Sequence, residues 1–135
     1  MSLALRHIRV HDCMHHGILS CAGDAPLGEV AGMMAKHRVH AVAVTNGDGR
    51  RVIAIVSDLD VAAAAADGRE PTALEVAATE PLTVSASEPM HHAAQLMVEH
   101  GVSHLVVVDP ASGYPVGILS TLDVAVLYAG AMVEA

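Results

Sequence analysis

Aromatic residues are nearly absent from this chain of 135 residues, which has no Trp, no Phe and only Tyr114 and Tyr128. Yet 53% of the residues are apolar, so the core must be built from Val, Leu, Ile, Met and Ala. Intrinsic disorder is excluded because disordered chains combine low hydrophobicity with high charge. The length suits one ordinary domain or two small, mutually dependent halves.

Positive charge is also scarce. The formal net charge is −8, and no Lys or Arg follows Arg69. Without a basic stripe or stacking aromatics, the chain lacks the features of a nucleic-acid-binding protein. Anionic membranes would repel it, and its longest uncharged apolar runs fall short of the ~20 residues that span a bilayer. We therefore expect neither a nucleic acid nor a membrane as partner.

Cysteine is limited to Cys13 and Cys21, which do not form a C-x-x-C pair. The N-terminus shows no charged-then-apolar signal peptide. Both observations favour a reduced, cytoplasmic protein.

The chain repeats itself. "IVSDLDVAA" begins at Ile55, and "ILSTLDVAV" begins 63 residues later at Ile118. At the same offset, without a gap, Pro26 aligns with Pro89, Ala31 with Ala94, Met34 with Met97, His37 with His100, Val39 with Val102 and Val44 with Val107. Agreement in register over this length predicts two copies of one supersecondary unit.

Each copy predicts the same order of elements. Apolar residues at spacings of three and four predict buried helix faces, made by Leu27, Val30, Ala31 and Met34 in residues 26–37 and by Met90, Ala94, Met97 and Val98 in residues 89–100. Hairpins follow, with strands at 40–45 and 51–56 and at 103–109 and 114–119, joined by Gly-containing turns. A second helix begins after Ser57 and after Ser120, and a short helix and a short strand (19–21 and 82–84) precede each copy.

A unit of roughly 60 residues buries little surface alone. We therefore expect one α+β fold in which two β-α-β-β-α repeats, residues 8–68 and 72–130, are related by a pseudo-twofold axis and pack sheet against sheet.

This order of elements resembles the cystathionine-β-synthase (CBS) domain, which occurs in tandem pairs called Bateman modules. The "D-x-M" at Asp12 and Met14, the "HGVSHLVVVD" around Ser103 and the closing Ser-x-x-Asp motifs carry the resemblance. It covers about residues 8–130, so we expect a free-standing pair with no separate catalytic domain.

Ser-x-x-Asp has two interpretations. As a capping box, the Ser hydroxyl accepts a hydrogen bond from a backbone N–H of the first helical turn, and the acid complements the helix dipole. In the proteins that this chain resembles, the Asp also accepts hydrogen bonds from the two ribose hydroxyls of an adenine nucleotide. The resemblance implies ligand-binding residues Ser20, Arg38, Val39, His40, Ile55, Ser57 and Asp60 in the first copy and Thr83, Val102, Ser103, His104, Ile118, Ser120 and Asp123 in the second.

The resemblance implies AMP, ADP, ATP or S-adenosylmethionine as a regulatory ligand, held in the cleft between the repeats. Lys36, His37, Arg38 and His40 can neutralise an anion near the first motif, whereas only His100 and His104 are near the second. A largely neutral His is a weak counter-ion at pH 7. The second site therefore favours AMP, adenosine or S-adenosylmethionine over ATP.

The ten histidines raise a second hypothesis. His11 and His15 are four residues apart and share one face if they lie on a helix, which is a spacing that can hold zinc. A complete site needs further ligands, for example His7, so our interpretation assigns no metal. The methionines, including Met33 and Met132, predict core packing.

The sequence predicts a non-enzymatic sensor that binds an adenine-containing metabolite and signals to an unknown effector protein. The resemblance also implies a homodimer, with contacts made by the helices after Ser57 and Ser120. The alternatives are a protein-interaction module with decayed nucleotide sites, and a metal- or redox-responsive stress protein that uses the N-terminal His and Cys residues.

Overall fold

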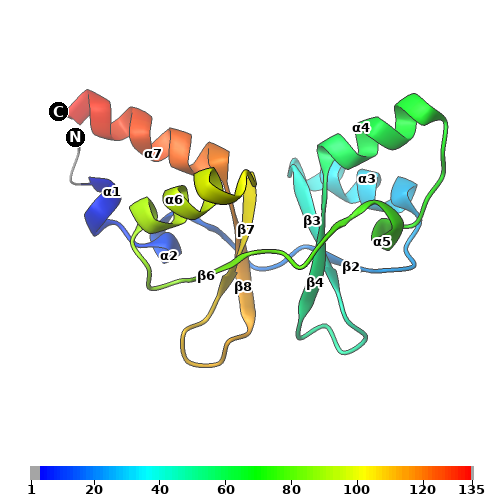
Figure 1. Cartoon of the computed structure of the whole chain (residues 1–135), viewed down its shortest axis with the longest axis horizontal. Helices are drawn as coiled ribbons and strands as arrows, with labels where there is room; N and C mark the ends of the chain where they lie inside the picture. Colours follow the sequence, from blue (N-terminus) through cyan, green and yellow to red (C-terminus); the bar gives the residue numbers. More distant parts are fainter. Residues whose placement is uncertain (1–3, 135) are drawn as a thin grey trace. The chain divides into compact units, whose positions relative to one another are not determined.

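The computed structural model describes residues 4–134, which form two compact units (Figure 1). The first unit is Ile18–Pro81. The second unit combines the described residues up to Gly17 with those from Leu82 onward. Each unit holds one four-stranded mixed sheet, so the α+β class and the two-repeat architecture are confirmed.

The first unit has the strand order β2-β3-β4-β5, in which β2 and β3 are parallel and the other pairs antiparallel. Its elements are β2 (Ser20–Ala22), α3 (Leu27–His37), β3 (Ala41–Thr45), β4 (Val52–Ser57), α4 (Asp58–Asp67), α5 (Ala73–Val76) and β5 (Ala78–Thr79).

The second unit has the order β1-β8-β7-β6 with the same pattern of directions. Its elements are α1 (Ala4–His7), α2 (Val10–Cys13), β1 (His15–His16), β6 (Thr83–Ser85), α6 (Met90–His100), β7 (His104–Val108), β8 (Pro115–Ser120) and α7 (Thr121–Glu134). Helix α1 and the two edge strands β1 and β5 were not predicted from the sequence.

The lead-in of each repeat joins the sheet of the other repeat. Strand β1 pairs with β8, and β5 pairs with β4. Equivalent backbone bonds secure both exchanges: Met90 N donates to Ile8 O, and Leu27 N donates to Pro71 O, each at 2.9 Å. The two connections are therefore built alike, in agreement with the 63-residue repeat.

Helices α3 and α6 begin after Pro26 and Pro89 and end in left-handed residues, Arg38 (φ 54°) and Gly101 (φ 64°). Proline suits a helix start because its missing N–H would have no partner in the first turn. Glycine adopts the left-handed region at little cost, whereas any other residue there is strained. The first repeat therefore carries strain at Arg38 that the second repeat avoids.

Each unit has its own apolar core between helices and sheet. In the first unit, Val42, Val44 and Val56 pack with Leu27 and Val30. In the second unit the core contains Met90, Ala93, Met97, Leu105, Val107 and Leu119. The packing role of the methionines is confirmed at Met34, Met90 and Met97, whereas the side chain of Met132 lies outside the described residues.

One predicted core residue is wrong. Val98 is 82% exposed. The buried stripe of α6 instead follows Met90, Ala93 and Met97, and Val98 lies about 100° around the helix from Met97.

Cys13 and Cys21 are unpaired and half-buried, and each packs against the core of its unit. The repeat aligns them with Val76 and Val84, so each thiol occupies an apolar position. Burial raises the pKa of both thiols, with smaller contributions from Asp12 and Asp123 at Cys13 and from Glu29 at Cys21. A raised pKa lowers the thiolate fraction at neutral pH, which makes both thiols less reactive.

None of the helices in residues 4–134 combines the length and apolar character needed to span a bilayer.

Substitutions in α6 test this packing. Met90 is 0% exposed, so Met90→Ala leaves a cavity and should lower the free energy of unfolding by about 2–5 kcal/mol. Val98→Ala, in the same helix, should change it by less than about 0.5 kcal/mol. Urea denaturation followed by circular dichroism measures both, and equal losses would contradict the core assignment.

Candidate functional site

The two Ser-x-x-Asp motifs form the same hydrogen-bonded box where a strand passes into a helix. Asp60 N donates to Ser57 Oγ (3.3 Å), while Ser57 N (2.8 Å) and Ser57 Oγ (3.1 Å) both donate to Asp60 Oδ2. Ser120 and Asp123 repeat these three bonds at the same distances. The capping interpretation of both motifs is confirmed.

The box in the first unit leaves acceptor capacity at the carboxylate of Asp60. The box uses only Oδ2 of Asp60 and, in the second unit, of Asp123. A carboxylate offers two oxygens and about four lone-pair sites. Asp60 and Asp123 are half-buried, and the box fixes their orientation. The start of α4 can therefore accept hydrogen bonds from a ligand at Asp60 without losing its cap.

In the first unit, several predicted residues share one face of the sheet. Residues paired across neighbouring strands point to the same face. Ser20 pairs with Ala43, Ala43 pairs with Ile55, and Ala41 pairs with Ser57. Ser20, Ile55 and Ser57 thus lie on the face opposite to the one that packs against α3 and α4.

The second unit repeats this arrangement. Thr83 pairs with Val106 and Val106 with Ile118, while His104 pairs with Ser120. The backbone register therefore brings Thr83, Ile118, Ser120 and His104 onto one sheet face. Leu105 and Leu119, which alternate with them, belong to the core on the helix side.

The segment before β3 flanks the first box. The carbonyl of His40 accepts a bond from Asp58 N, and His40 Nδ1 lies 2.9 Å from Asp58 Oδ2. Arg38, which is exposed, precedes His40 by two residues, and Val39 packs against the core. Sequence reasoning missed Asp58, although its place directly after the cap residue is the signal that could have indicated it.

The segment before β7 is built alike but carries less charge. Ser103 O accepts a bond from Thr121 N, and Ser103 Oγ lies 3.1 Å from His104 Nδ1. Val102 packs against the core of its unit. Thr121 takes the place of Asp58, so this helix start carries one carboxylate fewer than the first.

Ala54 takes the place of Gly117, and its methyl group packs in the core on the helix side. That methyl group therefore leaves the face that carries Ile55 and Ser57 unobstructed. Ser20 also borders a hollow of about 530 Å³ together with Asp24 and Glu29.

The predicted helical His11–His15 pair is wrong. Helix α2 ends at Cys13, and His15 belongs to β1, where its backbone pairs with Ile118. The side chain of His15 lies outside the described residues. Among the side chains that the structure describes, no group of three or more His, Cys, Asp or Glu residues is placed to hold a metal ion.

Comparison with known proteins gives concordant results. The chain is similar to a CBS domain protein, PAE2072 from Pyrobaculum aerophilum, in its complex with AMP: 34% identity, TM-score 0.78, covering 86% of this chain and 89% of that one. It shares the fold of the CBS domain pair of protein MJ0100, which was solved with 5′-methylthioadenosine and S-adenosyl-L-methionine, with 24% identity, TM-score 0.82 and coverage of 91% and 97%.

A curated relative is much longer than this chain. It is a homoserine O-acetyltransferase from Methanocorpusculum labreanum, 29% identical over 117 residues. The match covers 87% of this chain, and the chain spans 23% of the relative's length.

The family model of the CBS domain matches residues 10–67 and again residues 73–130. These matches cover both boxes and both sheets, and the chain therefore belongs to the CBS domain family, with two copies of the domain.

Proposed function

We propose that this protein is a non-enzymatic sensor that binds an adenine-containing metabolite at its helix starts and passes the signal to a partner. The observation that carries the proposal is the capping box, which appears twice with the same geometry and holds a carboxylate with one oxygen outside the box. The similarity to PAE2072, solved with AMP, supports the adenine class.

The chemistry of the site fits a nucleoside. The second oxygen of Asp60 or Asp123 accepts hydrogen bonds from the vicinal hydroxyls of a ribose. Ile55 and Ile118 offer apolar side chains to the base. Backbone N–H groups at the helix starts suit a phosphate because they are donors at the positive end of the helix dipole.

The two sites differ in their preference. Arg38 and the His40–Asp58 pair flank the first site, whereas Ser103, His104 and Thr121 flank the second. We therefore assign AMP to the first site, with ADP and ATP as weaker candidates. The second site suits adenosine or S-adenosylmethionine, whose sulfonium charge an acidic protein of net charge −8 would attract.

Strain at Arg38 supports its role. A residue held in a disfavoured backbone region points to a functional constraint when a simpler choice exists. The second repeat makes that simpler choice with Gly101. In this proposal, Arg38 is retained because its charge binds the phosphate.

We further propose that the module acts in the cytoplasm as a homodimer. The two unpaired cysteines support a reducing compartment. Leu59 on α4 is 75% exposed, and its equivalent Leu122 and the nearby Val126 on α7 are 55% and 65% exposed. Apolar helix faces of this kind suit contact with a second copy. The acetyltransferase activity of the longer relative is not assigned to this chain.

Removing the carboxylates tests the ribose role. At 100 times its Kd, AMP should stabilise the protein by about 2.7 kcal/mol. Asp60→Asn keeps one oxygen for the cap but removes the carboxylate, so AMP stabilisation should fall in thermal-shift assays. The double variant with Asp123→Asn should show none.

Glu75→Gln is the matched control, because Glu75 closes a similar capping box with Thr72 at the start of α5 and is not among the proposed ligand-binding residues. It should leave the AMP response unchanged. Full AMP stabilisation of the Asp60→Asn, Asp123→Asn double variant would refute the ribose role.

Replacing Arg38 tests the phosphate role. Arg38→Gly relieves the left-handed strain, on the order of 1 kcal/mol, so the ligand-free protein should be at least as stable. Calorimetric titration should show weaker AMP binding with adenosine binding unchanged. Arg38→Lys keeps the charge and should retain the preference for AMP, and an equal loss for AMP and adenosine in Arg38→Gly would contradict the assignment.

Sedimentation velocity tests the homodimer. Leu122→Glu and Val126→Glu place charge on the exposed face of α7 and should convert the dimer to monomer. Tyr114→Glu, at a half-exposed residue just before β8, is the control and should remain dimeric. A wild-type protein that sediments as a monomer would exclude the homodimer.

A further inference from the structure

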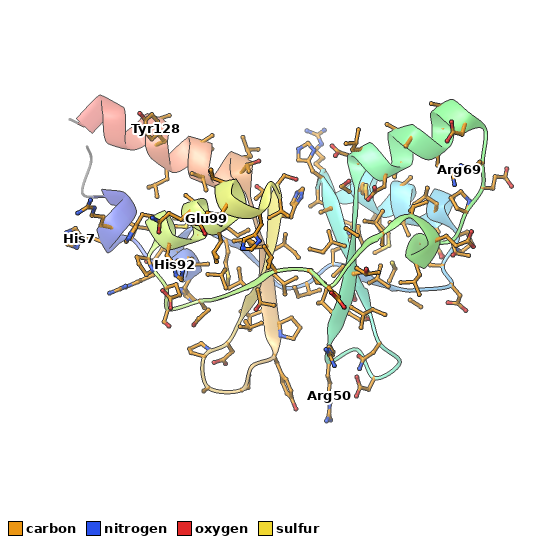
Figure 2. All side chains as sticks on the ribbon, viewed as in Figure 1. His7, Arg50, Arg69, His92, Glu99 and Tyr128 are labelled. Carbon is orange, nitrogen blue, oxygen red and sulfur yellow. The ribbon has the colours of Figure 1, made fainter. Side chains whose placement is uncertain are left out.

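A groove in the first unit lies between α3, α4 and the segment after α4. Its volume is about 390 Å³, within the range of roughly 300–1,000 Å³ that is usual for small-molecule sites. Leu27, Ala31 and Val61 contribute apolar walls, and Arg69 and Glu70 are the charged residues of its lining. Figure 2 shows Arg69 just beyond the C-terminal end of α4. None of the proposed nucleotide-binding residues lines this groove.

The second repeat explains why the groove is open. Three lining residues of the first unit, Gly28, Ala64 and Ala65, align at the 63-residue offset with His91, Leu127 and Tyr128. Leu127 packs against the core of its unit, and the half-buried His91 has its Nδ1 fully buried. The second repeat thus places larger side chains where the first repeat has small ones.

The space at Gly28 is real rather than filled by a neighbour. A Cβ at Gly28 would meet no atom within 4 Å. Gly28 lies in the first turn of α3 and is exposed, so no neighbouring side chain requires glycine there. The small residues Gly28, Ala64 and Ala65 leave room in the groove for an apolar group. That group can be about as large as the side chains at the equivalent positions of the second repeat.

The charges of the lining narrow the class of ligand. Arg69 Nε lies 3.4 Å from Asp67 Oδ2, an exposed contact that leaves the terminal guanidinium nitrogens for another carboxylate. Within residues 4–134, the carboxylate of Glu70 has no hydrogen bond or ion pair. Glu70 would repel a simple anion, and Arg69 would repel a simple cation. Neighbouring charges of opposite sign match the ammonium and carboxylate groups of a zwitterion.

We propose that this groove binds a free α-amino acid with an apolar side chain. The side chain occupies the space over Gly28 and Ala64, the carboxylate faces Arg69, and the ammonium group faces Glu70. The site is separate from the two helix-start sites, so one chain carries receptors for two chemical classes. Its occupancy stabilises the contact between α3 and α4.

Thermal shift and calorimetry with the full chain test the proposal. L-Leucine, L-methionine and L-phenylalanine should raise the melting temperature, while glycine, which lacks an apolar side chain, should not. 4-Methylpentanoate and isoamylamine carry one charge each and should bind at least about tenfold more weakly than leucine. If either compound binds with the same affinity as leucine, recognition of a zwitterion is refuted.

Variants that fill the groove test its location. Gly28→His and Ala64→Leu copy the second repeat and should abolish the response to leucine. Ala66→Leu adds the same bulk to an exposed position of α4 outside the groove and should retain it. Circular dichroism checks the fold of each variant. If Ala64→Leu fails to fold, Gly28→His still tests the groove, because a side chain added at Gly28 meets no atom within 4 Å of its Cβ. A leucine response that survives in a folded Gly28→His protein would overturn the proposal.

Charge variants complete the test. Arg69→Gln and Glu70→Gln should each weaken leucine binding at least about tenfold. Arg51→Gln and Glu99→Gln change exposed charges outside the groove and should have no effect. The AMP response should persist in all four variants, because the two classes of site do not share residues. Unchanged leucine binding in Arg69→Gln and Glu70→Gln, or no response of the wild-type protein to any apolar amino acid, would refute the site.

Discussion

The contact between a serine and the aspartate three residues later sets the chemistry of both repeats. It satisfies backbone donors that would otherwise be unpaired at a helix start, and it fixes the carboxylate at the end of a sheet. A side chain held by a structural bond needs no rearrangement to meet a ligand, so less entropy is lost on binding. In the proposed function, stability and recognition depend on the same atoms, and a substitution there has to be judged for both effects.

Two copies of one unit provide an internal comparison that a single domain lacks. Where the copies agree, as in the capping boxes and the Pro26 and Pro89 starts, the shared feature belongs to the fold. Where they differ, as at Arg38 and Gly101 or at Gly28 and His91, the backbone is the same and the side chain alone has changed. Those differences are the positions at which we propose separate properties for the two repeats.

Sequence periodicity predicted the main helices, the two hairpins and the caps, because each depends on residues close in the chain. It failed for features decided by distant contacts. The edge strand His15–His16 forms by pairing with β8, which is distant in the sequence. The orientation of α6 against its sheet buries Met97 and leaves Val98 exposed. The face shared by Ser20, Ile55 and Ser57 required the register of three strands, which local patterns do not specify.

The exchanged lead-ins have a consequence for how such a protein can arise. A stretch corresponding to one sequence repeat, residues 8–68, would carry β1, which pairs with the sheet of the second unit, and α2, whose Val10 packs in the core of that unit. It would lack β5, which completes its own sheet. A single ancestral copy would complete its sheet by exchanging the lead-in segment with a second, identical molecule. Gene fusion would then have converted that reciprocal exchange between two chains into a connection within one, so that each sheet is completed by a segment from the other half of the same chain.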